Sequence, residues 1–241
     1  MNLTTEVASQ DNSGTTYTAY SSPSFAATNG SLIIAIVRNG GSSTAVSSVK
    51  NSEGDSLSLD KHANYASSAV LYVCSLANTR TNSAETITMN FSTAQSDLSI
   101  IVLQFTGQHS PEVTDIETTT TGSSASPSIG SLTSAYAYEI VIAACCSVNN
   151  SAQGFTAGTI AGQTPTFNYA DAASGSESLM VEGYFTASTF SSQTASFTLA
   201  NSAEWVIVLV SYEGTAPALT DDDEQWRPAW VAQPDEQITL W

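Results

Sequence analysis

The chain has 241 residues, of which 41% are apolar and only 11% are charged. Its formal net charge is −17, with 22 acidic residues against five lysines and arginines. Such an excess of negative charge repels phosphate backbones and anionic headgroups, which argues against nucleic-acid and membrane-surface binding. The apolar content is sufficient for a packed core, and no apolar run approaches the ~20 residues of a membrane-spanning helix.

Short apolar runs follow one another along the chain, separated by clusters of Gly, Ser, Asn and Thr. In chain order they cover residues 32–37, 70–74, 87–91, 98–105, 140–146 and 205–210. Runs of this length with this punctuation are typical of β-strands. No stretch of a dozen residues sustains a 3.6-residue apolar period, so helices are not expected. The sequence predicts an all-β, antiparallel fold.

One block of the sequence occurs twice, 107 positions apart. Residues 97–107 read DLSIIVLQFTG and residues 204–214 read EWVIVLVSYEG, with acid, apolar run, aromatic and glycine in matching places. At the same offset, residues 33–37 match residues 140–144. A repeat at a fixed offset indicates that one fold is specified two times.

Each copy spans roughly 105 residues, which is the size of a single β-sandwich. We therefore predict two tandem β-sandwich domains that arose by internal duplication, at residues 1–108 and 109–215. Residues 216–241 match neither copy and are expected to form an extended C-terminal arm.

The strands predicted over residues 98–105 and 205–212 are apolar on both faces. A strand with one face in water would alternate with polar residues. Something therefore covers the second face, and the candidates are the other repeat or a neighbouring subunit of a homo-oligomer. The alternative is an exposed apolar face that the protein tolerates.

Residues with catalytic or metal-binding potential are few. The two histidines, His62 and His109, have no partner at ligand spacing, and we interpret both as solvated loop residues. Nucleophile-elbow and phosphate-loop motifs are missing. Residues 51–55 (NSEGD) are interpreted as a turn in which Gly54 takes a positive φ, rather than as a calcium loop. We expect no enzyme activity, no cofactor and no metal; a glycan hydrolase, which needs only two carboxylates, is the least favoured alternative.

The three cysteines, Cys74, Cys145 and Cys146, lie in apolar runs. Neighbours on a strand point to opposite faces, so a disulfide between the adjacent pair is geometrically poor. We expect all three to be buried as small hydrophobic residues. Reduced thiols fit synthesis in a cytoplasm, and residues 1–7 have no feature of a secretory signal.

The predicted arm carries three of the four tryptophans of the chain. Tryptophan is costly to leave in water and is a preferred anchor in interfaces. The acidic run at residues 221–224 is expected to be a solvated spacer. We predict that the arm binds a partner through Trp226, Arg227, Trp230, Ile238, Leu240 and Trp241. The alternative is that the arm folds back and completes the core of its own repeats.

The strand pattern of each unit resembles a family of proteins found mainly in tailed-phage genomes and in some bacteria. The resemblance rests on the strand at 32–37, the turn at 51–55, the strands at 70–74 and 87–91, and the closing strand at 100–107. It covers nearly all of residues 1–215, although the second copy lacks the turn motif. It implies jelly-roll-like β-sandwiches and supplies no catalytic residues.

The same resemblance implies a non-enzymatic structural protein of the phage virion, either a capsid decoration (cement) protein or a tail or fibre accessory. Such a protein is made in the host cytoplasm and lies at the virion surface. Its partners are capsid or tail subunits and further copies of itself, with a trimer favoured by analogy with jelly-roll decoration proteins. The alternative is a glycan-binding adhesion module that uses the tyrosines Tyr65, Tyr169 and Tyr184.

Overall fold

The structure is a computed structural model that describes residues 1–40, 46–65, 69–107, 114–133, 136–148, 154–172, 178–186 and 193–215. The strands of the first half are β1 (Asn2–Asp11), β2 (Tyr17–Ser21), β3 (Phe25–Ala27), β4 (Leu32–Asn39), β5 (Val46–Asn51), β6 (Ser58–Tyr65), β7 (Ala69–Leu76), β8 (Asn82–Glu85), β9 (Ile87–Gln95) and β10 (Leu98–Thr106). Those of the second half are β11 (Thr114–Ser124), β12 (Ser128–Leu132), β13 (Glu139–Ser147), β14 (Phe155–Ile160), β15 (Phe167–Ala170), β16 (Leu179–Phe185), β17 (Gln193–Leu199) and β18 (Ala203–Glu213). The predicted all-β fold is confirmed, and no helix that could cross a membrane is found in these ranges.

The strands of the first half pair in a nested order. β1 pairs with β10, β2 with β9, β3 with β8, and β4 with β7, all antiparallel. Nested pairing of this kind results when one long antiparallel hairpin is rolled over on itself, as in a jelly roll. Cross-pairs then complete a five-stranded sheet, β1-β10-β4-β7-β6, and a three-stranded sheet, β2-β9-β5. The first half is therefore a jelly-roll-like β-sandwich.

The second half has the same strand order. Its five-stranded sheet runs β11-β18-β13-β16-β15 and its three-stranded sheet runs β12-β17-β14. Each strand has a counterpart in the first half: β11 corresponds to β1, β18 to β10, β13 to β4, β16 to β7 and β15 to β6. The origin of the halves by duplication and their boundaries at residues 108 and 215 stay predictions.

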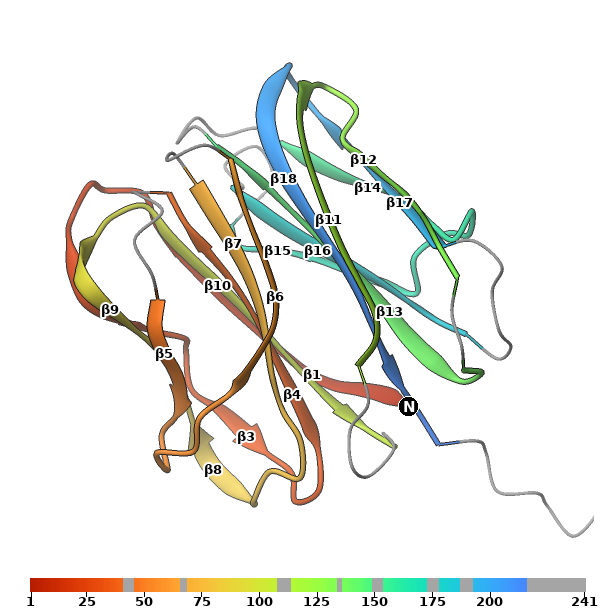
Figure 1. Ribbon diagram of the computed structural model, residues 1–241. Coiled ribbons are helices and arrows are strands. Elements are labelled where there is room, and N and C mark those ends of the chain that lie inside the picture. The colour runs from red at the N-terminus through yellow and green to blue at the C-terminus, as the bar shows by residue number, and fades with distance from the viewer. Residues whose placement is uncertain are drawn as a thin grey trace, which may run out of the picture.

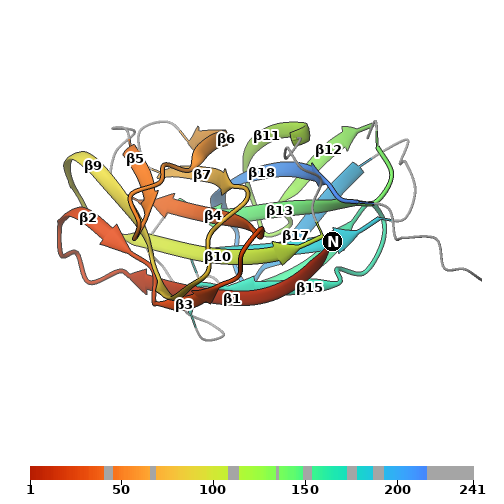
Figure 2. The ribbon, with the colours of Figure 1, turned by 90° about the horizontal axis from the view of Figure 1, so that it is seen from below.

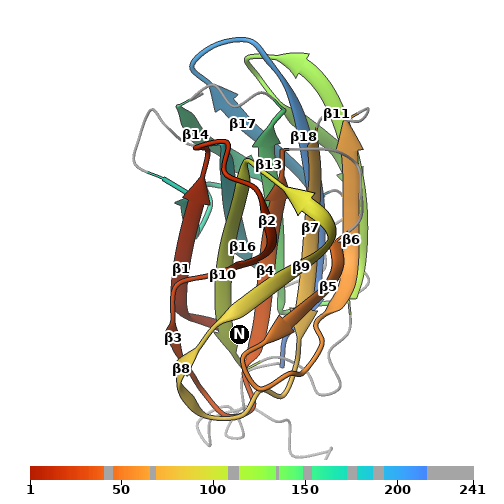
Figure 3. The ribbon, with the colours of Figure 1, turned by 90° about the vertical axis from the view of Figure 1, so that its left-hand side faces the viewer.

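The sheets form four layers (Figure 1), with the two five-stranded sheets in the middle and a three-stranded sheet on each outer side. Figure 3 shows the outer layer of the first half, with β2, β9 and β5 in front of the larger sheet. Three hydrophobic clusters fill the spaces between the layers, one inside each sandwich and one between the two halves. We call the cluster between the halves the middle core.

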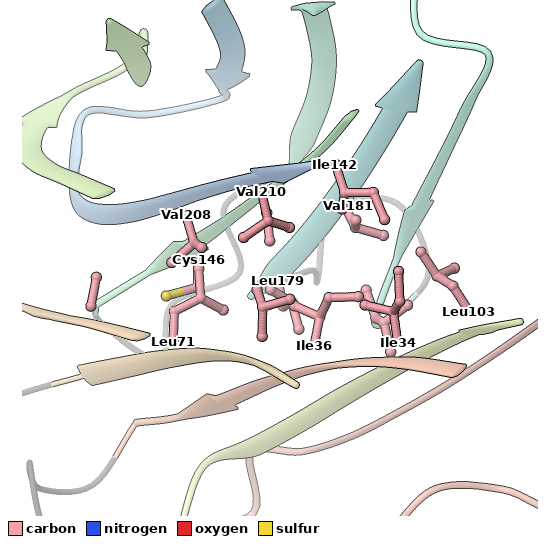
Figure 4. Close-up of a cluster of buried hydrophobic side chains, with 14 of the residues drawn as sticks. Ile34, Ile36, Leu71, Leu103, Ile142, Cys146, Leu179, Val181, Val208 and Val210 are labelled. Atoms are coloured by element: carbon pink, nitrogen blue, oxygen red, sulfur yellow. The ribbon is translucent and has the colours of Figure 1, made fainter. Parts of the chain in front are cut away.

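The middle core explains why the central strands are apolar on both faces. Ile34 and Leu103 of the first half face Ile142 and Val210 of the second half across it (Figure 4), and all four are fully buried. The cover predicted for the second face is thus provided by the other half of the same chain. The alternative of an exposed apolar face is wrong for these strands. Since the faces are covered within one chain, they provide no reason to expect a homo-oligomer, and the trimer stays a prediction.

The alignment of the two copies needs one correction. An offset of 107 pairs Ile33 with Ile140, but Ile33 faces the interior of the first sandwich whereas Ile140 faces the middle core. An offset of 108 pairs Leu32 with Ile140, and both of these lie in the middle core. A shift of one residue turns a strand over, so face matching requires 108 in β4 and β13. The offset of 107 holds for β10 and β18, where Leu103 and Val210 share the middle core.

At the interface between the halves, each edge strand of one five-stranded sheet lies beside the opposite edge strand of the other. In Figure 2, β6 lies beside β11 at one edge of the middle core and β1 lies beside β15 at the other edge. An ion pair of 3.0 Å joins Lys61 of β6 to Glu117 of β11, and Glu6 of β1 acts electrostatically on Tyr169 of β15. Because β11 is the counterpart of β1 and β15 that of β6, each half offers the same edges to the other. This is the arrangement of an isologous dimer.

Candidate functional site

Asp60 connects the two halves through a partly buried hydrogen-bond network. The hydroxyl of Tyr212 donates to Asp60 Oδ2 at 2.5 Å, and Ser75 Oγ donates to Oδ1 at 2.9 Å. The pairing of β6 with β7 is irregular between Leu59 and Lys61, so one extra residue turns Asp60 toward the middle core. Burial raises the pKa of this carboxyl, and the two hydroxyl donors oppose that effect.

Arg38 is a second polar link between the halves. Its side chain is fully buried at the end of β4, on the same face as Ile34 and Ile36. Nε donates to the carbonyl oxygen of Ser147 in the other half at 3.1 Å, and Nη1 donates to the carbonyl oxygen of Asp97 at 2.9 Å. This contact was not predicted from the sequence, although strand alternation over residues 32–39 places Arg38 on the same face as Ile34 and Ile36.

Glu182 is a buried carboxylate inside the second sandwich. Oε2 accepts the N–H of Gly158 at 3.1 Å, while Oε1 is buried and has no hydrogen-bond partner among the described residues. Burial raises the pKa of Glu182 to about 7. Residues 111–215 contain no lysine or arginine, so no cation of this half can pair with it. In the first half the corresponding position is taken by Cys74, as the pairing of β7 and β16 shows.

The described residues contain no group of three His, Cys, Asp or Glu side chains that could hold a metal ion. His62 is exposed as expected, but it lies on β6 rather than in a loop, and its ring stacks on Tyr72 at 5.8 Å. His109 lies outside the described residues.

All three cysteines are buried and free, as predicted. Cys145 faces the interior of the second sandwich and Cys146 faces the middle core, which confirms that they point to opposite sides of β13. Burial raises the pKa of the Cys74 and Cys146 thiols to about 12. Since the thiolate is the reactive form, these residues are poor nucleophiles.

Residues 51–55 form the predicted turn between β5 and β6. The N–H of Asp55 donates to Asn51 Oδ1 at 2.7 Å, and Gly54 has a φ of 91°. Arg80 lies 3.4 Å from Glu53 and 3.6 Å from Asp55, so the carboxylates of the turn are engaged by a cation.

A groove of about 340 Å³ opens beside this turn, between β5 and β6. β5 is the edge of the three-stranded sheet whereas β6 belongs to the five-stranded sheet, so the hairpin that joins them crosses the open side of the sandwich. The edge groove, as we call it, is lined by Val46, Ser47, Ser48, Val49, Ser56, Leu57, Leu59, Tyr72 and Cys74. Leu59 is 52% exposed there.

The arm residues predicted to bind a partner, Trp226, Arg227, Trp230, Ile238, Leu240 and Trp241, lie outside the described residues. The tyrosines considered for glycan binding are all half-buried. Tyr65 donates to Glu204 at 3.1 Å across the middle core, and Tyr184 packs on the core of the second sandwich. The exposed tyrosines in the described ranges are instead Tyr136 and Tyr138, at 40% and 36%.

Comparison with known proteins gives few matches. No protein-family model and no curated protein matches the chain. Among solved structures, the chain is similar to the major capsid protein P2 from bacteriophage PM2, with 10% sequence identity and a TM-score of 0.30. The match covers 90% of this chain and 100% of that chain. A likeness at this TM-score carries no conclusion about function.

Proposed function

We propose that the protein is a non-enzymatic structural component of a phage virion, either a capsid decoration (cement) protein or a tail or fibre accessory. The observation that carries the proposal is the middle core, which joins two jelly-roll-like sandwiches through a continuous apolar layer. Close-packed protein interiors have low compressibility, so a buried apolar layer resists deformation. The result is a stiff four-layered block, which suits a part that bears load or fills space. The strand-and-turn resemblance of residues 1–215 to a phage family supports the same function.

The surface and the arm fit this proposal. The strong negative charge keeps the protein soluble at the high local density of a particle surface. The arm provides an anchor, because a buried indole contributes far more to an interface than an exposed charge does. The proposed partners are capsid or tail subunits and further copies of the chain, and the proposed location is the virion surface after synthesis in the host cytoplasm.

Particles purified on a density gradient test this function. Quantitative mass spectrometry should find the chain in a fixed ratio to the major head or tail protein across gradient fractions. Detection in the soluble fraction alone, with none in intact particles, would overturn the proposal.

A glycan-binding adhesion module is the second candidate, and the exposure of Tyr136 and Tyr138 is the observation that favours it. Exposed aromatic rings beside polar loops are the usual platform for sugar rings. A glycan array distinguishes the two candidates, and we expect no binding. Binding that Tyr136→Ala abolishes would support the adhesion function instead.

A further inference from the structure

The edge groove has the chemistry that a tryptophan side chain requires. Val49, Leu57 and Tyr72 are buried and offer apolar contact, while three serine hydroxyls, of Ser47, Ser48 and Ser56, can accept the indole N–H. A volume of about 340 Å³ holds an indole ring. Apolar walls with a few placed polar groups are typical of binding sites.

The exposure of Leu59 indicates that the groove binds a further apolar group that covers this side chain. It is the most exposed of the large apolar side chains in the described part of the chain, and it lies on the rim of the edge groove. An occupant that covers Leu59 would remove apolar surface from water, which favours binding.

The chain itself carries a segment with the matching chemistry. Twenty-six residues follow Thr215, and they include Trp226, Trp230 and Trp241. The backbone of Thr215 is bonded to Gly107, at the end of the closing strand of the first half. Trp226 lies eleven residues farther on, and an extended chain of that length spans about 36 Å. The arm is therefore long enough for Trp226 to reach a second copy of the chain.

Charge favours the first sandwich as the acceptor. The residues just before Trp226 are Asp221, Asp222, Asp223 and Glu224. Residues 111–215 contain nine acids and no lysine or arginine, whereas all the basic residues outside the arm belong to the first half. One of these, Lys50, is exposed on β5 directly after Val49 of the groove lining. The first half is also net negative, with seven acids against four basic residues, but an acidic run is repelled less there than by the second sandwich and can approach Lys50.

We propose that the edge groove binds the C-terminal arm of a second copy of this chain, with Trp226 in the groove and residues 221–224 near Lys50. The inference rests on the anchoring role proposed for the arm and names its acceptor. Because groove and arm are different surfaces, the contact is head-to-tail and can extend from copy to copy.

Light scattering of the full-length chain tests the proposal. The wild type should self-associate with rising concentration, and Leu59→Glu and Trp226→Ala should each weaken self-association more than tenfold. Tyr136→Glu is the matched control, since it also places a charge at an exposed apolar side chain but on the second half, and it should leave self-association unchanged. An equimolar mixture of Leu59→Glu and Trp226→Ala should form one-to-one pairs, because one intact groove and one intact arm remain.

Three results would overturn the inference: a mixture of the two variants that stays monomeric, a wild type that stays monomeric, or equal weakening by the Tyr136→Glu control. A monomeric wild type whose indole fluorescence shifts on Leu59→Glu would mean that the arm binds its own groove. Particle incorporation is measured separately. A chain that associates through the groove but is absent from particles refutes the virion function and leaves the groove contact standing.

Discussion

The hydroxyl of Tyr212, in the last strand of the second sandwich, donates a 2.5 Å hydrogen bond to the carboxylate of Asp60 in the first sandwich. The two residues are 152 positions apart in the chain. Their contact lies on the side of the middle core where β6, β7, β11 and β18 meet. It is one of several polar contacts between the halves, and as a directional bond it helps to fix how they are aligned.

Tyr212→Phe should therefore destabilise the protein by about 2 kcal/mol, the usual contribution of a hydrogen bond to a charged group. Urea denaturation measures the loss. Tyr65→Phe is the control, because Tyr65 and its partner Glu204 are both only half-buried whereas Tyr212 is fully buried, so this variant should cost less. Equal costs for the two variants would contradict the role assigned to Asp60.

The shared middle core predicts that the two halves unfold together. Leu103→Ala should cost about 2–5 kcal/mol, as expected for a buried leucine. Hydrogen exchange followed by mass spectrometry should show that protection falls in β4 of the first half and in β13 of the second half alike. Loss of protection confined to the first half would show that the sandwiches are independent.

Arg38→Met should destabilise the protein by about 2 kcal/mol, because the buried carbonyl groups of Asp97 and Ser147 each lose a hydrogen bond from Arg38, although the Asp97 carbonyl retains the N–H of Gly40. Arg38→Lys keeps the charge but cannot reach both carbonyls with the same planar group. We expect it to recover only part of the loss in thermal melting. Full recovery would mean that charge rather than geometry matters at this position.

Glu182 predicts a pH dependence. Its pKa in the fold is about 7 against an ordinary value of 4.5, so between these pH values the folded state holds a proton that the unfolded state has lost. Stability contributed by this residue is thus highest below pH 4.5, falls as the pH rises to 7, and stays reduced above it. The total change is about 3 kcal/mol.

Glu182→Gln removes this dependence. Relative to the wild type, the variant should gain about 3 kcal/mol of stability between pH 4.5 and pH 8 in denaturant titrations. Glu53→Gln, a change at the surface ion pair with Arg80, should show no comparable gain. Parallel pH curves for wild type and Glu182→Gln would show that the carboxyl is hydrated in solution.

Deletion of residues 217–241 should leave residues 1–215 folded, because the described strands and all three hydrophobic clusters lie before residue 216. Incorporation into particles should be lost. Normal incorporation of the truncated chain would refute the anchoring role, and loss of the cooperative melt would show that the arm completes the core.

The strands and the burial of their faces could be predicted from the sequence, because both are encoded in the local order of apolar and polar residues. The double-faced strand at residues 98–105 predicted a covering layer, and the chain's own second half supplies it. The offset between Ile33 and Ile140 was wrong by one residue because both neighbours are apolar, so composition alone cannot tell which face a residue takes. The turn after β14 was also missed: Ala161 and Gly162 both have positive φ there, and alanine is not a residue that marks such a turn.

The hydrogen bonds that Asp60 and Arg38 make between the halves could not be predicted from local sequence patterns. Asp60 reaches Tyr212 only because β6 contains an irregular pairing, and Arg38 reaches Ser147 only because two sheets from distant parts of the chain stack face to face. The edge groove depends on β5 and β6 joining different sheets. Each of these features is set by three-dimensional placement rather than by neighbouring residues.

The two halves pack like the subunits of an isologous dimer, with β6 beside β11 and β1 beside β15, but they belong to one chain. A dimer of separate chains with this interface would dissociate at low concentration, whereas a covalent link holds the partners at a high effective concentration. One chain also frees the two partners from being identical. The first half has four basic residues, Arg38, Lys50, Lys61 and Arg80, while the second half has none. A nearly symmetric body therefore has two electrically different halves and can be oriented by its surroundings.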